Sequence, residues 1–231
     1  MGLENLHIAS IVELLVCFFV RRSLTDTPPT RELTRFFMKV INEISSLSGD
    51  SISQSIKQRL LDVSASDTLF REKLEGNIYE ENWNVTRFVL CGLAEKGMTV
   101  ESWTNLWRRK NRQFVWSIEH IFPQGRNIPE CWVNMIASGN ETKAQECQRS
   151  HVHRLGNLTI SGYNSTLGNK SFEEKRDRRS KNGNSIGYRN GLVLNEDLAN
   201  ANSWSVDHIE KRTDKLVQQV LDIYSLDRRP L

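Results

Sequence analysis

The chain has 231 residues, 38% of them hydrophobic, so it is long and apolar enough for one large or two modest globular domains. The formal net charge of +3 is unevenly distributed. Residues 1–100 carry 11 basic and 13 acidic side chains, whereas residues 101–231 carry 20 and 15. The second half is therefore the expected anion-binding part of the chain.

The cysteines and the most apolar run exclude two further classes of protein. Cys17, Cys91, Cys131 and Cys147 lie far apart and form no C-x-x-C pair, which argues against a zinc knuckle and a disulfide framework. Because the cysteines form no such pattern, we expect the protein to lie in a reducing, cytoplasmic compartment. The apolar run at residues 11–20 contains an acidic residue, lacks a basic leader, and reaches about half the length of a membrane span. We expect a buried helix there and no membrane anchor.

The first hundred residues show the periodicity of helices. One helix is expected over residues 6–22, and a second over residues 31–46 with Thr30 as its cap. Two or three more helices are expected between residues 51 and 96. No catalytic pattern occurs in this part of the chain. Residues 1–100 are therefore interpreted as a helical scaffold or docking region.

The pattern changes after residue 97. The stretch "QFVWSIEHIFPQ" predicts a strand that reaches Ile121 and ends before Pro123. The elements expected after it are a helix over residues 128–137, a polar connection over 138–150, a short strand Leu158–Ile160, a charged helix from Ser165 or Thr166 to Asn182-Gly183, and an amphipathic helix within Ser205–Leu226. Together these elements predict an α+β fold that is mostly helical.

The segment "SIEHIFPQ" interrupts an apolar run with an acid and a histidine. Metal-assisted phosphodiester hydrolysis uses this pair: the imidazole of His120 takes a proton from the attacking water, and the carboxylate of Glu119 helps to hold a divalent cation. Successive strand residues point to opposite faces, so the two can serve one site only at a strand end or bend. Asn164 is a candidate oxygen ligand, because Mg²⁺ accepts amide oxygens. Alone, Asn164 would be read as a helix cap and Gly156-Asn157 as a turn.

The ordered set "IEHIFPQ" and "HRLGNLTISGYNSTLGNKSFEEK" resembles the HNH nuclease signature of the ββα-metal fold. More narrowly, it is similar to the C-terminal domain of GmrSD-type restriction endonucleases. His120 to Pro123 corresponds to the H-x-x-P motif of that domain, and residues 156–160 correspond to its G-N-L-T element. The resemblance covers about residues 101–225. It implies an HNH nuclease domain over residues 101–231 that ends in the amphipathic helix.

The resemblance implies a role for each matching residue. His120 would be the general base, and Asn157 would brace the loop and orient the His120 ring. Glu119 and Asn164 would be metal ligands, with Asn169 competing with Asn164. Lys175 would contact a phosphate or stabilise charge in the transition state. The third position of the triad is asparagine rather than histidine, which favours Mg²⁺ or Mn²⁺ over tightly bound Zn²⁺.

Two groups of basic residues accompany the motif. The first is "RRKNR", with Arg108, Arg109, Lys110 and Arg112. The second lies on the expected charged helix and includes Lys170, Arg176 and Arg179. Such runs are often solvated faces, but beside a nuclease motif we expect contacts with DNA phosphates. No helix-turn-helix, zinc-finger or RRM pattern is present, so sequence-specific readout is not expected.

The family setting implies a metal-dependent DNA endonuclease that nicks or cuts DNA as the effector part of a bacterial restriction or antiphage defence system. In GmrSD-type and SspE-type proteins an N-terminal NTPase-like half senses modified DNA, so such a half or partner subunit is expected here too. Three alternatives remain open: an RNase or single-strand nuclease, a DNA-binding module with an inactive HNH site, and a structural helical adaptor.

Overall fold

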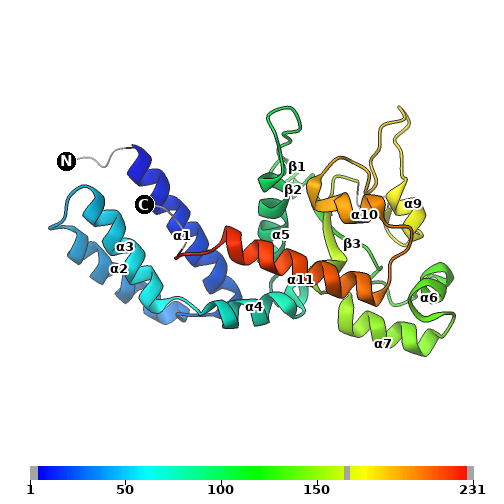
Figure 1. The fold of residues 1–231 in the computed structure, drawn as a ribbon, viewed down its shortest axis with the longest axis horizontal. Helices are drawn as coiled ribbons and strands as arrows, with labels where there is room; N and C mark the ends of the chain where they lie inside the picture. Colours follow the sequence, from blue (N-terminus) through cyan, green and yellow to red (C-terminus); the bar gives the residue numbers. More distant parts are fainter. Residues whose placement is uncertain (1–4, 164–166, 228–231) are drawn as a thin grey trace. The chain divides into compact units, whose positions relative to one another are not determined.

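The computed structural model describes residues 5–163 and 167–227 of the chain (Figure 1). The chain divides into two compact units. Unit 1 comprises residues 1–73 and 218–231, and unit 2 comprises residues 74–217. The division falls within the helices α4 (Asp67–Glu75) and α11 (Val206–Ile223), whereas the sequence placed its domain boundary near residue 100.

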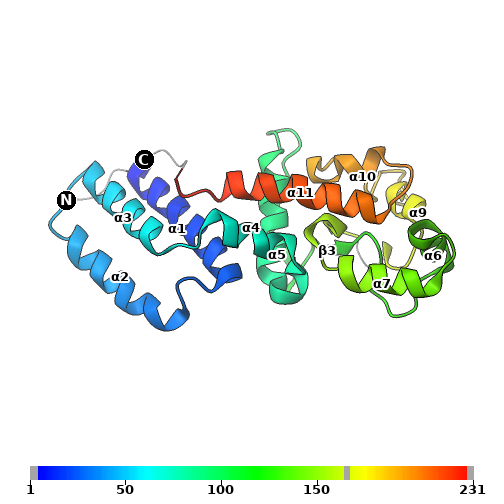
Figure 2. The same cartoon turned by 60° about the horizontal axis from the view of Figure 1, so that its bottom comes forward.

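Unit 1 is helical, as expected, but Pro29 rather than Thr30 is the N-cap of its second helix. Its helices α1 (Asn5–Thr25), α2 (Thr30–Ile44) and α3 (Asp50–Val63) pack side by side (Figure 2). The apolar run of α1 buries one face, with Leu14 and Phe18 inside, so the expected buried helix is confirmed for that face. Within the described ranges of the chain, no helix is both long and apolar enough to cross a membrane.

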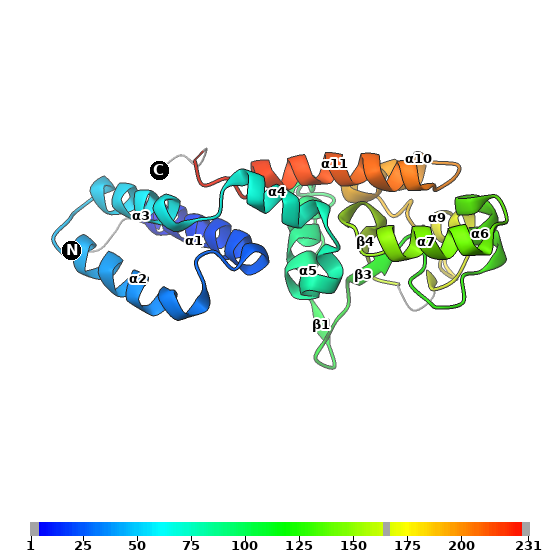
Figure 3. The ribbon, with the colours of Figure 1, turned by 90° about the horizontal axis from the view of Figure 1, so that it is seen from below.

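The strand expected over "QFVWSIEHIFPQ" is two strands in unit 2, residues 113–114 and 117–120, and a further strand at residues 109–110 was not predicted. The helix α5 (Ile78–Lys96) leads into a small hairpin of β1 (Arg109–Lys110) and β2 (Gln113–Phe114), which projects from the body of the unit (Figure 3). A second antiparallel pair follows, formed by β3 (Ser117–His120) and β4 (Leu158–Ser161). The strand predicted over Leu158–Ile160 is confirmed.

Short helices complete unit 2: α6 (Glu130–Ala137), α7 (Glu141–His151), the 3-10 turns η1 (Leu155–Asn157) and η2 (Val193–Asn195), α9 (Phe172–Arg176) and α10 (Glu196–Asn200). The strands β3 and β4 are followed by α9, which is the ββα order expected of an HNH core. The fold is α+β and mostly helical, so the predicted fold class is confirmed.

Two predicted elements were wrong. The expected polar connection over residues 138–150 contains α7, whose polar sequence buries only Ala144 and whose first turn is capped by the side chain of Asn140. The expected long charged helix is the five-residue α9, which begins after a capping box of Ser171 and Glu174 and ends at Arg176. The predicted start at Ser165 or Thr166 lies outside the described residues.

The packing of α11 against η1 fixes the approach to β4. A side chain at Gly156 would place its Cβ 2.0 Å from the carbonyl oxygen of Ile209, so only glycine permits this contact. The buried guanidinium of Arg212 donates to the carbonyl oxygens of Gly156 and Leu158, each at 2.8 Å. The helix α11 therefore packs against the G-N-L-T segment and fixes its position.

Candidate active site

Glu119 and His120 are the last two residues of β3, where they pair with Thr159 and Leu158 of β4. Both are buried, with 3% and 6% of their surfaces exposed. Because consecutive strand residues point to opposite faces, the two side chains meet different neighbours.

The carboxylate of Glu119 forms a buried ion pair with Lys175 of α9, at 2.7 Å between Oε1 and Nζ. The same Nζ donates to the carbonyl oxygens of His120 at 2.8 Å and Ile121 at 3.0 Å. These acceptors match the N–H donors of an ammonium group, so we treat the pair as ionised. Burial raises the pKa of Glu119, the charge and hydrogen bond of Lys175 oppose this rise, and the resulting pKa is about 7. Burial likewise lowers the pKa of Lys175, against the attraction of Glu119.

This ion pair does not support two of the roles expected from the resemblance. Glu119 faces Lys175 rather than the His120 ring, so its carboxylate is not available as a metal ligand in this arrangement. Lys175 is fully buried and cannot reach a phosphate. The physical reason is the alternation of β3, which no bend interrupts before His120. The pair instead ties α9 to the end of β3.

The ring of His120 lies in a cluster of three rings. Its Nε2 is 3.3 Å from Nδ1 of His153, which is within hydrogen-bonding distance. The edge of Tyr79, from α5, meets the His120 ring with 4.6 Å between centroids and an interplanar angle of 82°. Tyr79 also stacks on His153, at 5.3 Å and 13°.

Burial, together with smaller effects of a positive charge on His153 and of the charge on Lys175, lowers the pKa of His120 to about 3. Burial also lowers the pKa of His153. Both imidazoles are therefore neutral at neutral pH. A neutral imidazole has one unprotonated ring nitrogen, which is the form that can accept a proton from water.

Asn157 holds the chain that follows His120. Its Oδ1 accepts from the backbone N–H of Phe122 at 2.9 Å, and its Nδ2 donates to the carbonyl oxygens of Phe122 and Val152, each at 3.0 Å. The side chain is fully buried. Loss of these hydrogen bonds would leave buried backbone groups unpaired, so Asn157 fixes the turn between β3 and Pro123.

The residues expected to bind metal are not assembled into a complete ligand set within the described ranges. Asn164 lies outside them. Asn169 is exposed, with its amide beside Gly125, and Glu119 is paired with Lys175. No cluster of three or more His, Cys, Asp or Glu side chains with metal-binding geometry occurs among the residues described. Of the predicted metal ligands, the described residues therefore leave only the exposed amide of Asn169 free of an ion pair.

The two groups of basic residues differ in whether their side chains pair with acidic side chains or carbonyl oxygens. On and after α9, Lys170 is paired with Glu174 at 3.4 Å, Arg176 with Asp177 at 2.6 Å, and Arg179 donates to the carbonyl oxygen of Gly183. The first group forms the β1–β2 hairpin and the residue before it: Arg108, Arg109, Lys110 and Arg112, all exposed. No ion pair to these four residues occurs in the described part of the chain.

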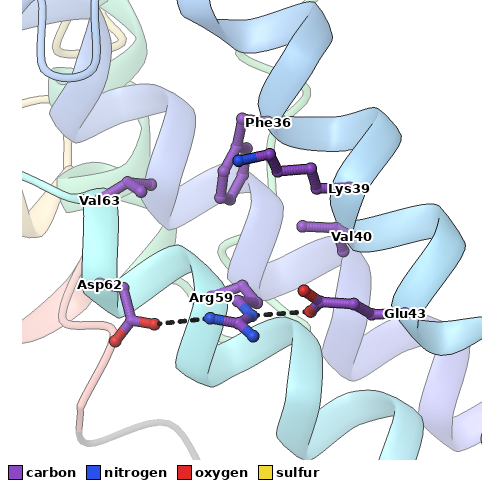
Figure 4. A pocket seen from close by; sticks show the side chains of 7 residues that line it. All are labelled: Phe36, Lys39, Val40, Glu43, Arg59, Asp62 and Val63. Carbon is purple, nitrogen blue, oxygen red and sulfur yellow. Dashed lines mark hydrogen bonds and ion pairs between the residues drawn. The ribbon is translucent and has the colours of Figure 1, made fainter.

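A separate pocket lies between α2 and α3 in unit 1 (Figure 4). Arg59 crosses it, 2.7 Å from Glu43 and 3.5 Å from Asp62. The acids neutralise the arginine, and none of the residues expected to act in catalysis lines this pocket.

Two residues of the ring cluster had no catalytic role in the sequence analysis. His153 directly precedes "RLGNLT", and this adjacency to the motif is a signal that could have drawn attention to it. Tyr79 carries no such signal, because it reaches the site only through the packing of α5 against η1 and β4. Its backbone N–H donates to the carbonyl oxygen of His153 at 3.3 Å.

Comparison with known proteins agrees with the motif and the geometry. Residues 64–219 match the family described as GmrSD restriction endonucleases, C-terminal domain. No curated protein matched the chain. The family match covers most of the chain, including the β3–β4 pair, α9 and the ring cluster. The chain therefore belongs to the family of the C-terminal domain of GmrSD restriction endonucleases.

Proposed function

We propose that this chain is an endonuclease that hydrolyses phosphodiester bonds of DNA, with His120 as the general base and a divalent cation, Mg²⁺ or Mn²⁺, as cofactor. The observation that carries the proposal is the position of His120 at the end of β3, with its ring held against His153, within a domain of a restriction endonuclease family. The family also supports a role as the effector part of a restriction or antiphage system, working with an NTPase-like sensor half.

The proposed chemistry begins at the unprotonated ring nitrogen of His120. This nitrogen takes one proton from water while the water oxygen forms a bond to phosphorus and the bond to the leaving sugar oxygen breaks. Asn157 keeps the backbone beside His120 in place during this step. A divalent cation would neutralise the charge that develops on the phosphate, and Asn164 and Asn169 are its proposed oxygen ligands.

The β1–β2 hairpin is the proposed main contact with the DNA backbone. Its four cations are exposed and lack ion-pair partners in the described part of the chain. Arg87 of α5 supports the base of the hairpin, because its guanidinium lies 3.5 Å from the centre of the Phe114 ring and donates to the carbonyl oxygen of Trp116. Release of counterions from the duplex would favour this contact.

Incubation with a panel of substrates tests the proposal. Supercoiled plasmid, linear duplex, single-stranded DNA and RNA would each be incubated with Mg²⁺, Mn²⁺ or EDTA. We expect cleavage of the plasmid that requires the cation, and the ratio of open-circular to linear product distinguishes nicking from double-strand cutting. If the chain cleaves only RNA or only single-stranded DNA, the alternative function of an RNase or single-strand nuclease would replace the proposal.

A second candidate is a DNA-binding module that does not cleave. The observation that favours it is the low exposure of His120, only 6% of whose surface is accessible. Retarded migration of duplex DNA in a gel, with no product under any cation, would support this candidate.

A further inference from the structure

The ring cluster of His120, His153 and Tyr79 brings together side chains from three separate segments of unit 2. His120 ends β3, His153 lies in the turn after α7, and Tyr79 lies in the first turn of α5. The Nε2 of His120 and the Nδ1 of His153 are 3.3 Å apart. Stacking of Tyr79 on His153, together with the backbone hydrogen bond between them, fixes the orientation of the His153 ring.

The proton between these two nitrogens can have only two positions. A neutral imidazole carries one N–H, so one ring must donate and the other must accept. If His153 donates from Nδ1, the lone pair of His120 Nε2 is occupied and His120 carries its own proton on Nδ1. His120 would then have no free basic nitrogen. If His120 donates from Nε2, its Nδ1 is unprotonated, and no hydrogen bond to that atom occurs within the described ranges.

We propose that His153 is the positioning residue of the nuclease site: it accepts the hydrogen bond from His120 Nε2 and so assigns His120 Nδ1 as the nitrogen that takes the proton from water. This inference rests on the proposed function of His120 as the general base. Tyr79 would affect the tautomer of His120 only indirectly, because it stacks on His153 and orients that ring.

The same contact favours the step in which His120 gains a proton. When Nδ1 of His120 takes the proton, the ring becomes positively charged and its Nε2–H becomes a stronger donor. The hydrogen bond to a neutral His153 is then charge-assisted and offsets part of the cost that burial imposes on protonating His120, whereas a positive charge on His153 would lower the pKa of His120. Glu80, next to Tyr79, adds a negative charge that acts on the His153 ring.

A pair of substitutions separates positioning from folding. His153→Leu removes the acceptor, whereas His153→Asn keeps an acceptor oxygen near the place of Nδ1. We expect His153→Leu to lower kcat on plasmid DNA by about 10- to 100-fold, with Kd for DNA unchanged, and His153→Asn to restore most of the loss. Thermal midpoints of both variants control for folding. Equal kcat in all three proteins, or a loss that follows only the midpoint, would overturn the inference.

A spectroscopic measurement tests the inference without relying on cleavage. In the native chain labelled with ¹⁵N-histidine, we expect His120 to carry its proton on Nε2 and His153 to have an unprotonated Nδ1. The opposite arrangement would overturn the inference even if the chain cleaves DNA. If the expected tautomers are found but no DNA is cleaved, the proposed function fails and the hydrogen-bonded pair stands. Binding of added Mn²⁺ or Zn²⁺ directly between the two nitrogens would also contradict the hydrogen bond.

Discussion

Glu119 and His120 are neighbours in the chain, but β3 separates their environments. Glu119 pairs with Lys175 on one face, and His120 meets His153 and Tyr79 on the other. The carboxylate therefore stabilises the position of α9, and the imidazole is left as the group with proton-accepting capacity. The sequence analysis placed both residues in one metal-assisted reaction, whereas the structure gives Glu119 a structural contact and leaves His120 as the proposed base.

Substitution of Glu119 tests the structural role. Glu119→Gln leaves the Lys175 ammonium buried without its counter-charge, so we expect the free energy of unfolding to fall by about 3–5 kcal/mol, measured with urea. Lys175→Met should have a comparable effect, and the double variant should lose less than the sum of the two. If Glu119→Gln keeps full stability and only weakens Mn²⁺ binding, the metal-ligand role would be right and the structural role wrong.

The pKa of His120 predicts how stability changes with pH. Its value in the folded chain, about 3, lies below the ordinary value of 6.5, so the folded state binds fewer protons. The contribution of neutral His120 is complete above pH 6.5 and is lost as the pH falls toward 3. Between pH 7 and pH 5 we expect a loss of about 2 kcal/mol relative to His120→Asn, which cannot titrate. Parallel urea unfolding of both proteins at the two pH values measures the difference, and identical pH dependence would contradict the burial of His120.

The family resemblance implied that Asn157 braces the loop after His120, and its hydrogen bonds to Phe122 and Val152 are consistent with that role. The sequence did not predict the ion pair of Glu119 with Lys175, since two residues 56 positions apart are joined only by the packing of α9. Nor did it predict Tyr79, which depends on the placement of α5. Residue types indicate possible chemistry, but tertiary packing decides which groups meet.

At the scale of elements, the β1–β2 hairpin shows an unusual choice of turn residues. Asn111 and Arg112 form its two-residue loop, and both have positive φ, 51° and 66°. This geometry strongly favours Asn followed by Gly, because a side chain at positive φ is strained. The arginine therefore costs stability, which is consistent with a function for its charge at the tip of the hairpin.

The substitution Arg112→Gly tests whether the charge of Arg112 contributes to DNA binding rather than to folding. We expect the stability to be unchanged or raised by up to about 1 kcal/mol, because glycine tolerates the turn. Affinity for duplex DNA should fall, and the slope of log K against log salt concentration should decrease by about 0.9 if one phosphate contact is lost. Arg31→Ala on α2 removes the same charge from unit 1 and serves as the control. Equal DNA affinity of Arg112→Gly and the native chain would exclude the hairpin tip as a contact.

The elements that sequence analysis missed are those with weak periodicity. The charged helix α7 buries only Ala144, and α9, which was expected to be long, has five residues and buries only Phe172 and Lys175. By contrast, the strong amphipathic pattern of α11 predicted the helix correctly, and its apolar residues Ile209, Val217 and Val220 are buried. Hydrophobic patterning predicts elements well only where burial of one face stabilises them.

At the scale of the whole molecule, the proposed chemistry is concentrated in unit 2. The family match spans residues 64–219, and unit 2 spans residues 74–217, so the two nearly coincide. Unit 1 contains none of the proposed catalytic or DNA-contacting residues. The sequence assigned it a scaffold or docking role, and this role stays a prediction. The separation implies that substitutions in unit 1 should affect activity only through stability or through a partner.

The central claim is that His120 is the general base of a DNA endonuclease. The direct test compares the native chain, His120→Ala, and His208→Gln, which alters an exposed histidine of α11, on supercoiled plasmid with Mn²⁺. We predict that His120→Ala lowers the single-turnover cleavage rate by about 10²- to 10⁴-fold at unchanged DNA affinity, while His208→Gln cleaves at the native rate. Cleavage by His120→Ala at the native rate would contradict the account.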